Sequence, residues 1–148
     1  MRKFLLMIFS ACLLTQAHAF PCYITMMKDN CWTAYDVNVD LIDVATEQVI
    51  ASMSIPKGKS WDRKEIVCQP KQVVKLKAKF SPDIWVKDKG REYVGKRFWS
   101  FPEQINQGDA AWNMVLCFSR DIQDVPLPPD VSGQCACDAK DIPPIAPR

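Results

Sequence analysis

The sequence predicts an all-β protein, a small antiparallel β-sandwich, and three observations lead to this prediction. Short segments alternate apolar and polar side chains with a period of two, and turn residues separate them. Six cysteines follow an N-terminal segment with the features of an export signal. Six of the eleven prolines fall after residue 124, where the alternation has ended.

The alternating segments give the expected strands. Between Tyr35 and Leu41 every odd position is apolar, and every even position is Asp or Asn. Similar segments follow, so we expect strands over residues 35–41, 48–55, 61–68, 74–80, 93–101 and 112–119. Short strands with turn signals at this spacing are typical of a sandwich of Ig-like or related type. Helical periodicity is absent, apart from a single turn expected around Pro102 to Asn106.

Residues 1–19 are expected to be a cleaved signal peptide. Arg2 and Lys3 precede a short apolar stretch, and the segment ends in Ala17-His18-Ala19. The apolar stretch is too short for a transmembrane helix, which needs about 20 residues. The alternative is lipoprotein processing at Cys12, which we disfavour because Phe9 stands where such sites usually have Leu. The expected organisation is signal peptide 1–19, β-sandwich domain 20–124 and Pro-rich extended tail 125–148.

The expected mature chain has no histidine, because His18 belongs to the signal. Nucleophilic triads that need an imidazole base are therefore excluded, and zinc, copper and iron sites built on imidazole are disfavoured. The five glycines are isolated, so no phosphate-binding loop is present. We expect neither an enzyme nor a bound cofactor or metal.

The cysteines that remain after the signal predict a disulfide framework of up to three bridges. They are Cys22, Cys31, Cys68, Cys117, Cys135 and Cys137. Neighbours two apart on an extended chain lie near the limit of disulfide reach, so Cys135 and Cys137 should each bond elsewhere. We expect at least one of them to join a cysteine before residue 120, with Cys68 to Cys117 as a tentative bridge within the body. The alternative for Cys135 and Cys137 is a redox or soft-metal site.

A partial calcium-loop pattern occurs in the first predicted strand. Asp36, Asn38, Asp40 and Glu47 stand at positions 1, 3, 5 and 12 of such a loop. Position 6 is Leu41, where the sharp turn requires glycine. The segment is therefore better interpreted as the solvated face of a strand.

Positive charge is concentrated in the middle of the chain. Residues 57–97 carry 13 basic and five acidic side chains, whereas both flanking segments are acidic. Lys75, Lys77 and Lys79 should form a row on one face of a strand whose other face is buried, and this row is the candidate binding site for an acidic partner. The simpler alternative is that these lysines protect a sheet edge from pairing with other chains.

These observations favour a non-catalytic binding or structural module of the bacterial envelope, periplasmic or secreted, with another envelope or exported protein as its partner. Five tryptophans, a residue type common at interfaces, give this hypothesis some support. Nucleic acid is not expected as a partner, because residues 20–148 carry equal numbers of basic and acidic side chains. No transmembrane segment is expected after signal cleavage. The alternatives are a secreted effector or inhibitor acting on another protein, and a small redox or metal-handling protein that uses Cys135 and Cys137.

Overall fold

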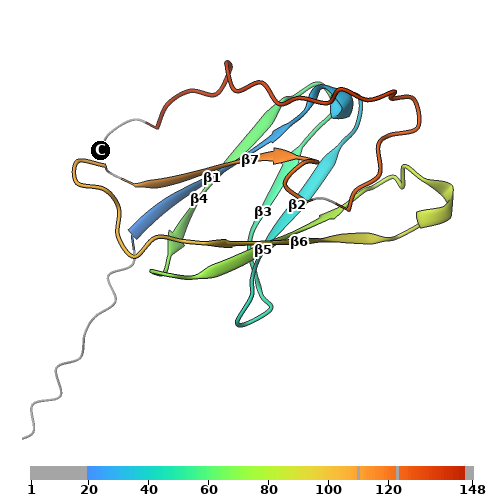
Figure 1. The fold of residues 1–148 in the computed structure, drawn as a ribbon. Coiled ribbons are helices and arrows are strands. Elements are labelled where there is room, and N and C mark those ends of the chain that lie inside the picture. The colour runs from blue at the N-terminus through green and yellow to red at the C-terminus, as the bar shows by residue number, and fades with distance from the viewer. Residues whose placement is uncertain (1–19, 110, 123, 146–148) are drawn as a thin grey trace, which may run out of the picture.

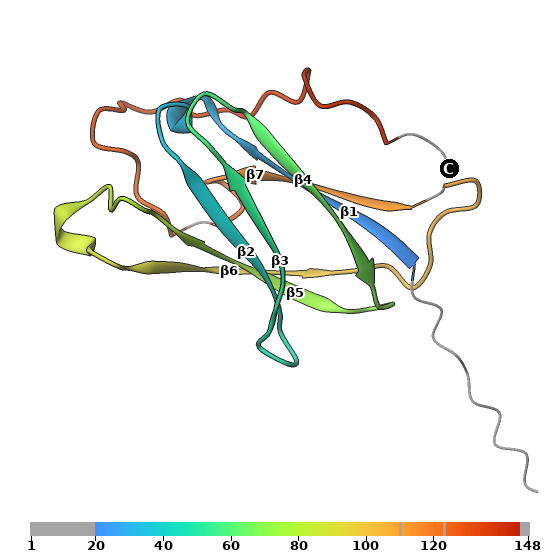
Figure 2. The same ribbon diagram turned by 180° about the vertical axis from the view of Figure 1, so that it is seen from behind.

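Two sheets make up the computed structural model, which describes residues 20–109, 111–122 and 124–145 (Figures 1 and 2). The predicted signal peptide, residues 1–19, lies outside the described residues. In chain order the elements, with η marking a short 3-10 helix, are β1 (Phe20–Lys28), η1 (Asn30–Trp32), β2 (Val37–Asp43), β3 (Val49–Ile55), β4 (Trp61–Cys68), β5 (Val73–Lys79), η2 (Val86–Asp88), β6 (Glu92–Ser100) and β7 (Trp112–Phe118).

The two sheets face each other as a β-sandwich, which confirms the predicted fold class. One sheet has the order β4-β1-β7 and the other the order β3-β2-β5-β6. Every predicted strand is present, with its ends within about two residues of the expected positions. One pairing departs from the antiparallel prediction, because β1 runs parallel to β7.

The core lies between the sheets and is built by the alternation seen in the sequence. On β5, the side chains of Val74, Leu76 and Ala78 are fully buried, while the lysines between them point to the other face. Val37, Val39 and Leu41 fill the same layer from β2. Burial of these apolar faces is the main favourable contribution to folding.

The C-terminal segment, residues 124–145, contains neither helix nor strand but is fastened to the body at several points. Figures 1 and 2 show it running along the outer side of the three-stranded sheet. Val125, Val131 and Cys135 pack against the core. Its polar attachments include hydrogen bonds from Trp85 Nε1 to the Leu127 carbonyl (3.2 Å) and from Arg63 to the Pro143 carbonyl (2.9 Å).

β1 was not predicted, and its burial on both faces explains why. Its inward side chains Cys22, Ile24 and Met26 are fully buried in the core. Its outward side chains Thr25 and Met27 are also buried, although neither belongs to the core cluster. The C-terminal segment crosses this outer face, so β1 is covered on both sides and shows no alternation of apolar and polar residues.

Within the part of the chain that the structure describes, no helix has the length and apolar character needed to cross a membrane.

Candidate functional site

Three disulfides join the six cysteines, in the pairs Cys22–Cys68, Cys31–Cys135 and Cys117–Cys137. The tentative bridge between Cys68 and Cys117 is wrong. Cys68 lies on β4 and Cys117 on β7, and the unpredicted strand β1 runs between them. Two strand spacings amount to about 9.6 Å, beyond the reach of a disulfide. Cys68 therefore bonds to Cys22 on the adjacent strand.

The expected attachment of the last two cysteines to the body is confirmed. Cys135 bonds to Cys31 in η1, and Cys137 bonds to Cys117 on β7. The chain between them is held as well, since the Ala136 N–H donates to Asn30 Oδ1 at 2.8 Å. The C-x-C pair thus fixes the C-terminal segment across the end of β1.

One cluster of potential metal ligands lies at this attachment. A carboxylate oxygen of Asp29 and the sulfurs of Cys31 and Cys135 all lie within 4.8 Å of one another. The two sulfurs are bonded to each other, so neither is a thiolate. Burial raises the pKa of Asp29, and hydrogen bonds from the N–H groups of Cys31 and Ser119 oppose this rise. In this state the cluster caps η1 and holds the chain after β7.

The predicted lysine row is present on β5, but two of its three charges are neutralised. Lys75 forms an ion pair with Glu47 at 2.6 Å, and Lys77 forms one with Glu92 at 3.1 Å. Only Lys79 has no ion pair with a described carboxylate. The row therefore presents much less free positive charge than the sequence suggests.

The remaining free lysines gather at one end of the sandwich. Five lysines make no ion pair, hydrogen bond or ring contact through their side chains among the described residues: Lys57, Lys59, Lys79, Lys87 and Lys89. They belong to two segments of the chain, residues 57–59 and 79–89. By contrast, cations on the body have partners, as in Lys96–Asp124 and Arg97–Asp121.

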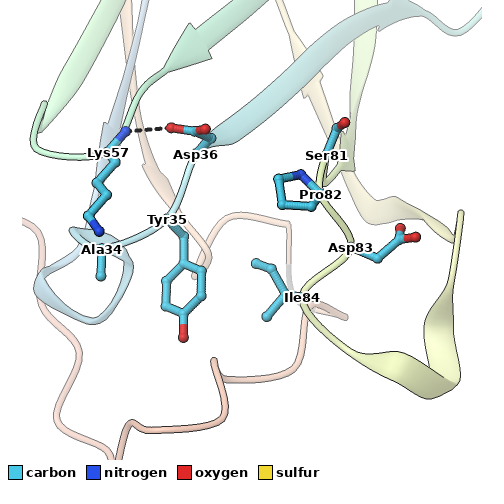
Figure 3. Close-up of a pocket in the computed structure, with 8 residues that line it drawn as sticks. All are labelled: Ala34, Tyr35, Asp36, Lys57, Ser81, Pro82, Asp83 and Ile84. Carbon is cyan, nitrogen blue, oxygen red and sulfur yellow. Dashed lines mark hydrogen bonds between the residues drawn. The ribbon is translucent and has the colours of Figure 1, made fainter.

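We define the loop end as three connections: the β1–β2 loop (29–36), the β3–β4 turn (56–60) and the β5–β6 loop (80–91). Figures 1 and 2 both place them at the same end of the sandwich. A cavity of about 330 Å³ opens where they meet. Figure 3 shows the residues that line it: Ala34, Tyr35, Asp36, Lys57, Ser81, Pro82, Asp83 and Ile84.

Two of these connections are joined by the buried side chain of Lys28, at the end of β1. Its ammonium group donates to the carbonyl oxygens of Tyr35 (2.8 Å) and Pro56 (2.9 Å). Burial lowers the pKa of Lys28, and the nearby Asp36 carboxylate partly opposes the lowering. The Lys57 N–H also donates to Asp36 Oδ1 at 2.6 Å (Figure 3). The cavity wall formed by Tyr35, Asp36 and Lys57 is therefore firmly held.

An aromatic cluster packs next to the cavity and includes its lining residue Tyr35. Trp32 is fully buried and stacks on Phe80 with ring centroids 5.2 Å apart. It also meets Tyr35, Trp85 and Phe118 edge to face. Since the backbone of the β5–β6 loop continues directly from Phe80 to Trp85, this cluster sets the position of Pro82 and Ile84 at the cavity.

The β5–β6 loop is braced by its own hydrogen bonds. Gly90 N–H donates to Asp83 Oδ1 at 2.8 Å, with Gly90 at a φ of 70° that favours glycine. The Tyr93 hydroxyl donates to Asp88 Oδ2 at 2.9 Å. Burial and this hydrogen bond raise the pKa of Tyr93 to about 12, while the same bond lowers the pKa of Asp88. The loop therefore presents Val86, which is 96% exposed, from a braced turn.

The arrangement is suited to holding a side chain or a short chain segment. Tyr35, Pro82 and Ile84 offer apolar contact, and Asp36 and Asp83 each have one carboxylate oxygen engaged by a backbone N–H. A volume of about 330 Å³ is at the lower limit for small-molecule pockets. The cavity is thus better matched to one part of a larger partner than to a whole cofactor.

Sequence reasoning did not identify the loop end. Its cavity joins residues from three separate connections, and no local pattern marks such a meeting. The only sequence signals are the turn residues Ser81-Pro82-Asp83 and the concentration of lysines after residue 56.

Comparisons of this chain with protein-family models, with curated proteins and with solved structures gave no match, so its function has to be inferred from its own residues.

Proposed function

We propose that this protein is an exported, non-catalytic binding module that recognises another protein outside the cytoplasm through its loop end. The observation that carries the proposal is the gathering of free lysines and exposed apolar side chains on braced loops. Val86 is 96% exposed and Leu127, whose carbonyl is bound by Trp85, is 44% exposed. Apolar contacts surrounded by charge are typical of protein-binding surfaces.

The three disulfides support the export part of the proposal. Disulfides persist in oxidising compartments and are rare in the cytosol. The N-terminal signal features point the same way. The exported protein should have an intact mass that matches a chain beginning at Phe20, whereas a lipid-modified Cys12 would contradict this processing.

A photo-crosslinking amino acid placed at position 86 tests the binding site in the cells that produce the protein. Val67 is the matched control, because it is 72% exposed and lies on β4, away from the loop end. We expect the probe at position 86 to form a discrete adduct with another exported protein, and the probe at position 67 to form none. Adducts at position 67 alone, or at neither position, would refute the proposal.

The identity of the captured protein separates an envelope module from a secreted effector or inhibitor, since both use the same binding surface. The redox or metal alternative has less support, because the sulfurs of Cys135 and Cys137 are both bonded in this structure.

A further inference from the structure

We propose that the loop end binds an acidic segment of its protein partner, with an apolar side chain of that segment in the cavity beside Tyr35. This inference rests on the proposed function and adds the chemistry of the partner. It begins from the distribution of charge that folding produces, which differs from the distribution in the sequence.

In the folded protein, most lysines on the body of the sandwich are paired with carboxylates. Lys64, Lys71 and Lys96 each have a carboxylate partner, as do Lys75 and Lys77 on β5. Four of the five free lysines belong to the loop end, and the fifth, Lys79, ends β5 directly before it. Three carboxylates of the loop end have no ion pair among the described residues: the buried Asp29, and Asp36 and Asp83 at the cavity. The excess charge of this end is positive, and it would attract an acidic segment.

The free lysines surround the apolar contacts. Lys57 itself lines the cavity, and Lys59 follows two residues later on the same turn. Lys87 lies in η2 and Lys89 directly follows it, next in the chain to the exposed Val86. A segment that alternates acidic and apolar side chains could place its carboxylates at these ammonium groups while its apolar side chains contact Tyr35, Ile84 or Val86.

The loops are already held in place, which lowers the entropy lost on binding. Lys28 joins two of them through backbone carbonyls, and the Trp32 cluster supports the third. Binding that does not have to order loops keeps more of its contact energy.

The two carboxylates at the cavity favour a protein segment over a uniform polyanion. Asp36 and Asp83 both line the cavity, where they would repel a phosphate or sulfate group. Residues 20–148 carry no net charge, so long-range attraction for a polyanion is weak. A peptide can place a neutral or apolar side chain beside these carboxylates.

Selection from a random peptide library displayed on phage tests the inference with the oxidised protein. The library is selected on the wild-type protein alone, and the binding of the enriched peptides is then measured on the wild type and on the variant K57Q/K59Q/K87Q/K89Q. The matched control, K64Q/K71Q/K96Q/K140Q, removes four exposed lysines that have carboxylate partners. Circular dichroism establishes that each variant is folded.

We expect the enriched peptides to be acidic with interspersed apolar residues. The loop-end variant should bind them about tenfold more weakly, and the control variant should bind them as the wild type does. Added salt should weaken wild-type binding and have little effect on the loop-end variant. V86S should weaken binding without changing its salt dependence.

Three results would overturn the inference. One is enrichment of neutral or basic peptides, or no enrichment at all. A second is equal binding of the peptides by the loop-end variant and the wild type. The third is tighter binding of heparin or of phosphatidylglycerol vesicles than of any peptide. Neutral or basic peptides that lose affinity in V86S would reject only the acidic partner, whereas peptides insensitive to both V86S and the loop-end variant would also count against the proposed function.

Discussion

The ammonium group of Lys28 lies 2.8 Å from the carbonyl oxygen of Tyr35, and this contact links the end of the buried strand β1 to the wall of the loop-end cavity. Lys28 is only 4% exposed, and its ammonium group donates to the backbone carbonyls of Tyr35, Ile55 and Pro56. A charge in such a position is costly to bury unless its donors are satisfied. Here it satisfies carbonyls from two loops at once, so it fixes their relative position.

Replacing Lys28 with methionine should lower the free energy of unfolding by about 2 kcal/mol. Methionine keeps much of the apolar stem but leaves the Tyr35 carbonyl without a donor and the Pro56 carbonyl with the Lys59 N–H alone. A buried group left without a partner costs about 1–3 kcal/mol. Removal of the buried charge offsets part of this cost. Urea unfolding measures the change, and the control is Lys57→Met, whose side chain makes no polar contact among the described residues. A K28M protein as stable as wild type would show that the lysine does not hold the loops.

The two bridges of the C-terminal segment should differ in their contributions to stability. Cys31 and Cys135 are 104 residues apart in sequence, whereas Cys117 and Cys137 are 20 apart. The loop-closure model gives a difference of about 1.5 kcal/mol in favour of the longer loop. The double variants C31S/C135S and C117S/C137S, compared by denaturant unfolding, measure it. A larger loss for C117S/C137S would show that local packing around Met27 outweighs chain entropy.

Most of the fold followed from local alternation in the sequence. Strands β2 and β3 were predicted because one of their faces is buried and the other is solvated, which leaves a period of two in the residue types. The same reasoning failed for β1. Its outer side chains Thr25 and Met27 are covered by a segment more than 100 residues later in the chain, and no local pattern encodes that cover.

The missing strand also explains the wrong cysteine pairing. Without β1, nothing in the sequence indicates that a strand lies between Cys68, which ends one predicted strand, and Cys117, which lies near the end of another. The lysine row shows the same limit for charge. Lys75 and Lys77 were correctly placed on one face, but their partners Glu47 and Glu92 come from a turn and from another strand. Ion pairs between distant segments depend on how the strands pair, and the residue composition of a segment does not determine this register.

The stability of the protein should fall with rising pH between about 10 and 12 because of Tyr93. The folded state raises the pKa of this phenol to about 12, mainly through burial and then through the Asp88 hydrogen bond, while an unfolded tyrosine titrates near 10. The folded state therefore holds more protons in this window, and its free energy of unfolding declines as the pH rises. Tyr93→Phe should remove this part of the slope, as measured by urea unfolding at several pH values.

Lys28, whose pKa is lowered, contributes to the pH dependence of the free energy of unfolding with the opposite sign. It does so in both proteins, so the difference between their slopes isolates Tyr93. Equal slopes for wild type and Y93F would contradict the assignment.

Charge reversal on β5 should separate the lysines that stabilise the fold from the one that is free to bind. K75E/K77E places carboxylates beside Glu47 and Glu92, so two attractive pairs become repulsive. Ion pairs this exposed contribute about 0.5 kcal/mol each, and the repulsion adds a similar amount, so the free energy of unfolding should fall by about 1–2 kcal/mol. K79E has no ion pair to lose but places a carboxylate opposite Glu92 on β6, so the free energy of unfolding should fall by only about 0.5 kcal/mol. Urea unfolding measures both variants.

If the loop end binds an acidic segment, K79E should also weaken that binding, because Lys79 stands two residues before the cavity residue Ser81. If K75E/K77E proves as stable as wild type, the cross-strand pairs contribute nothing measurable and all three lysines are available to a partner, as the sequence first suggested.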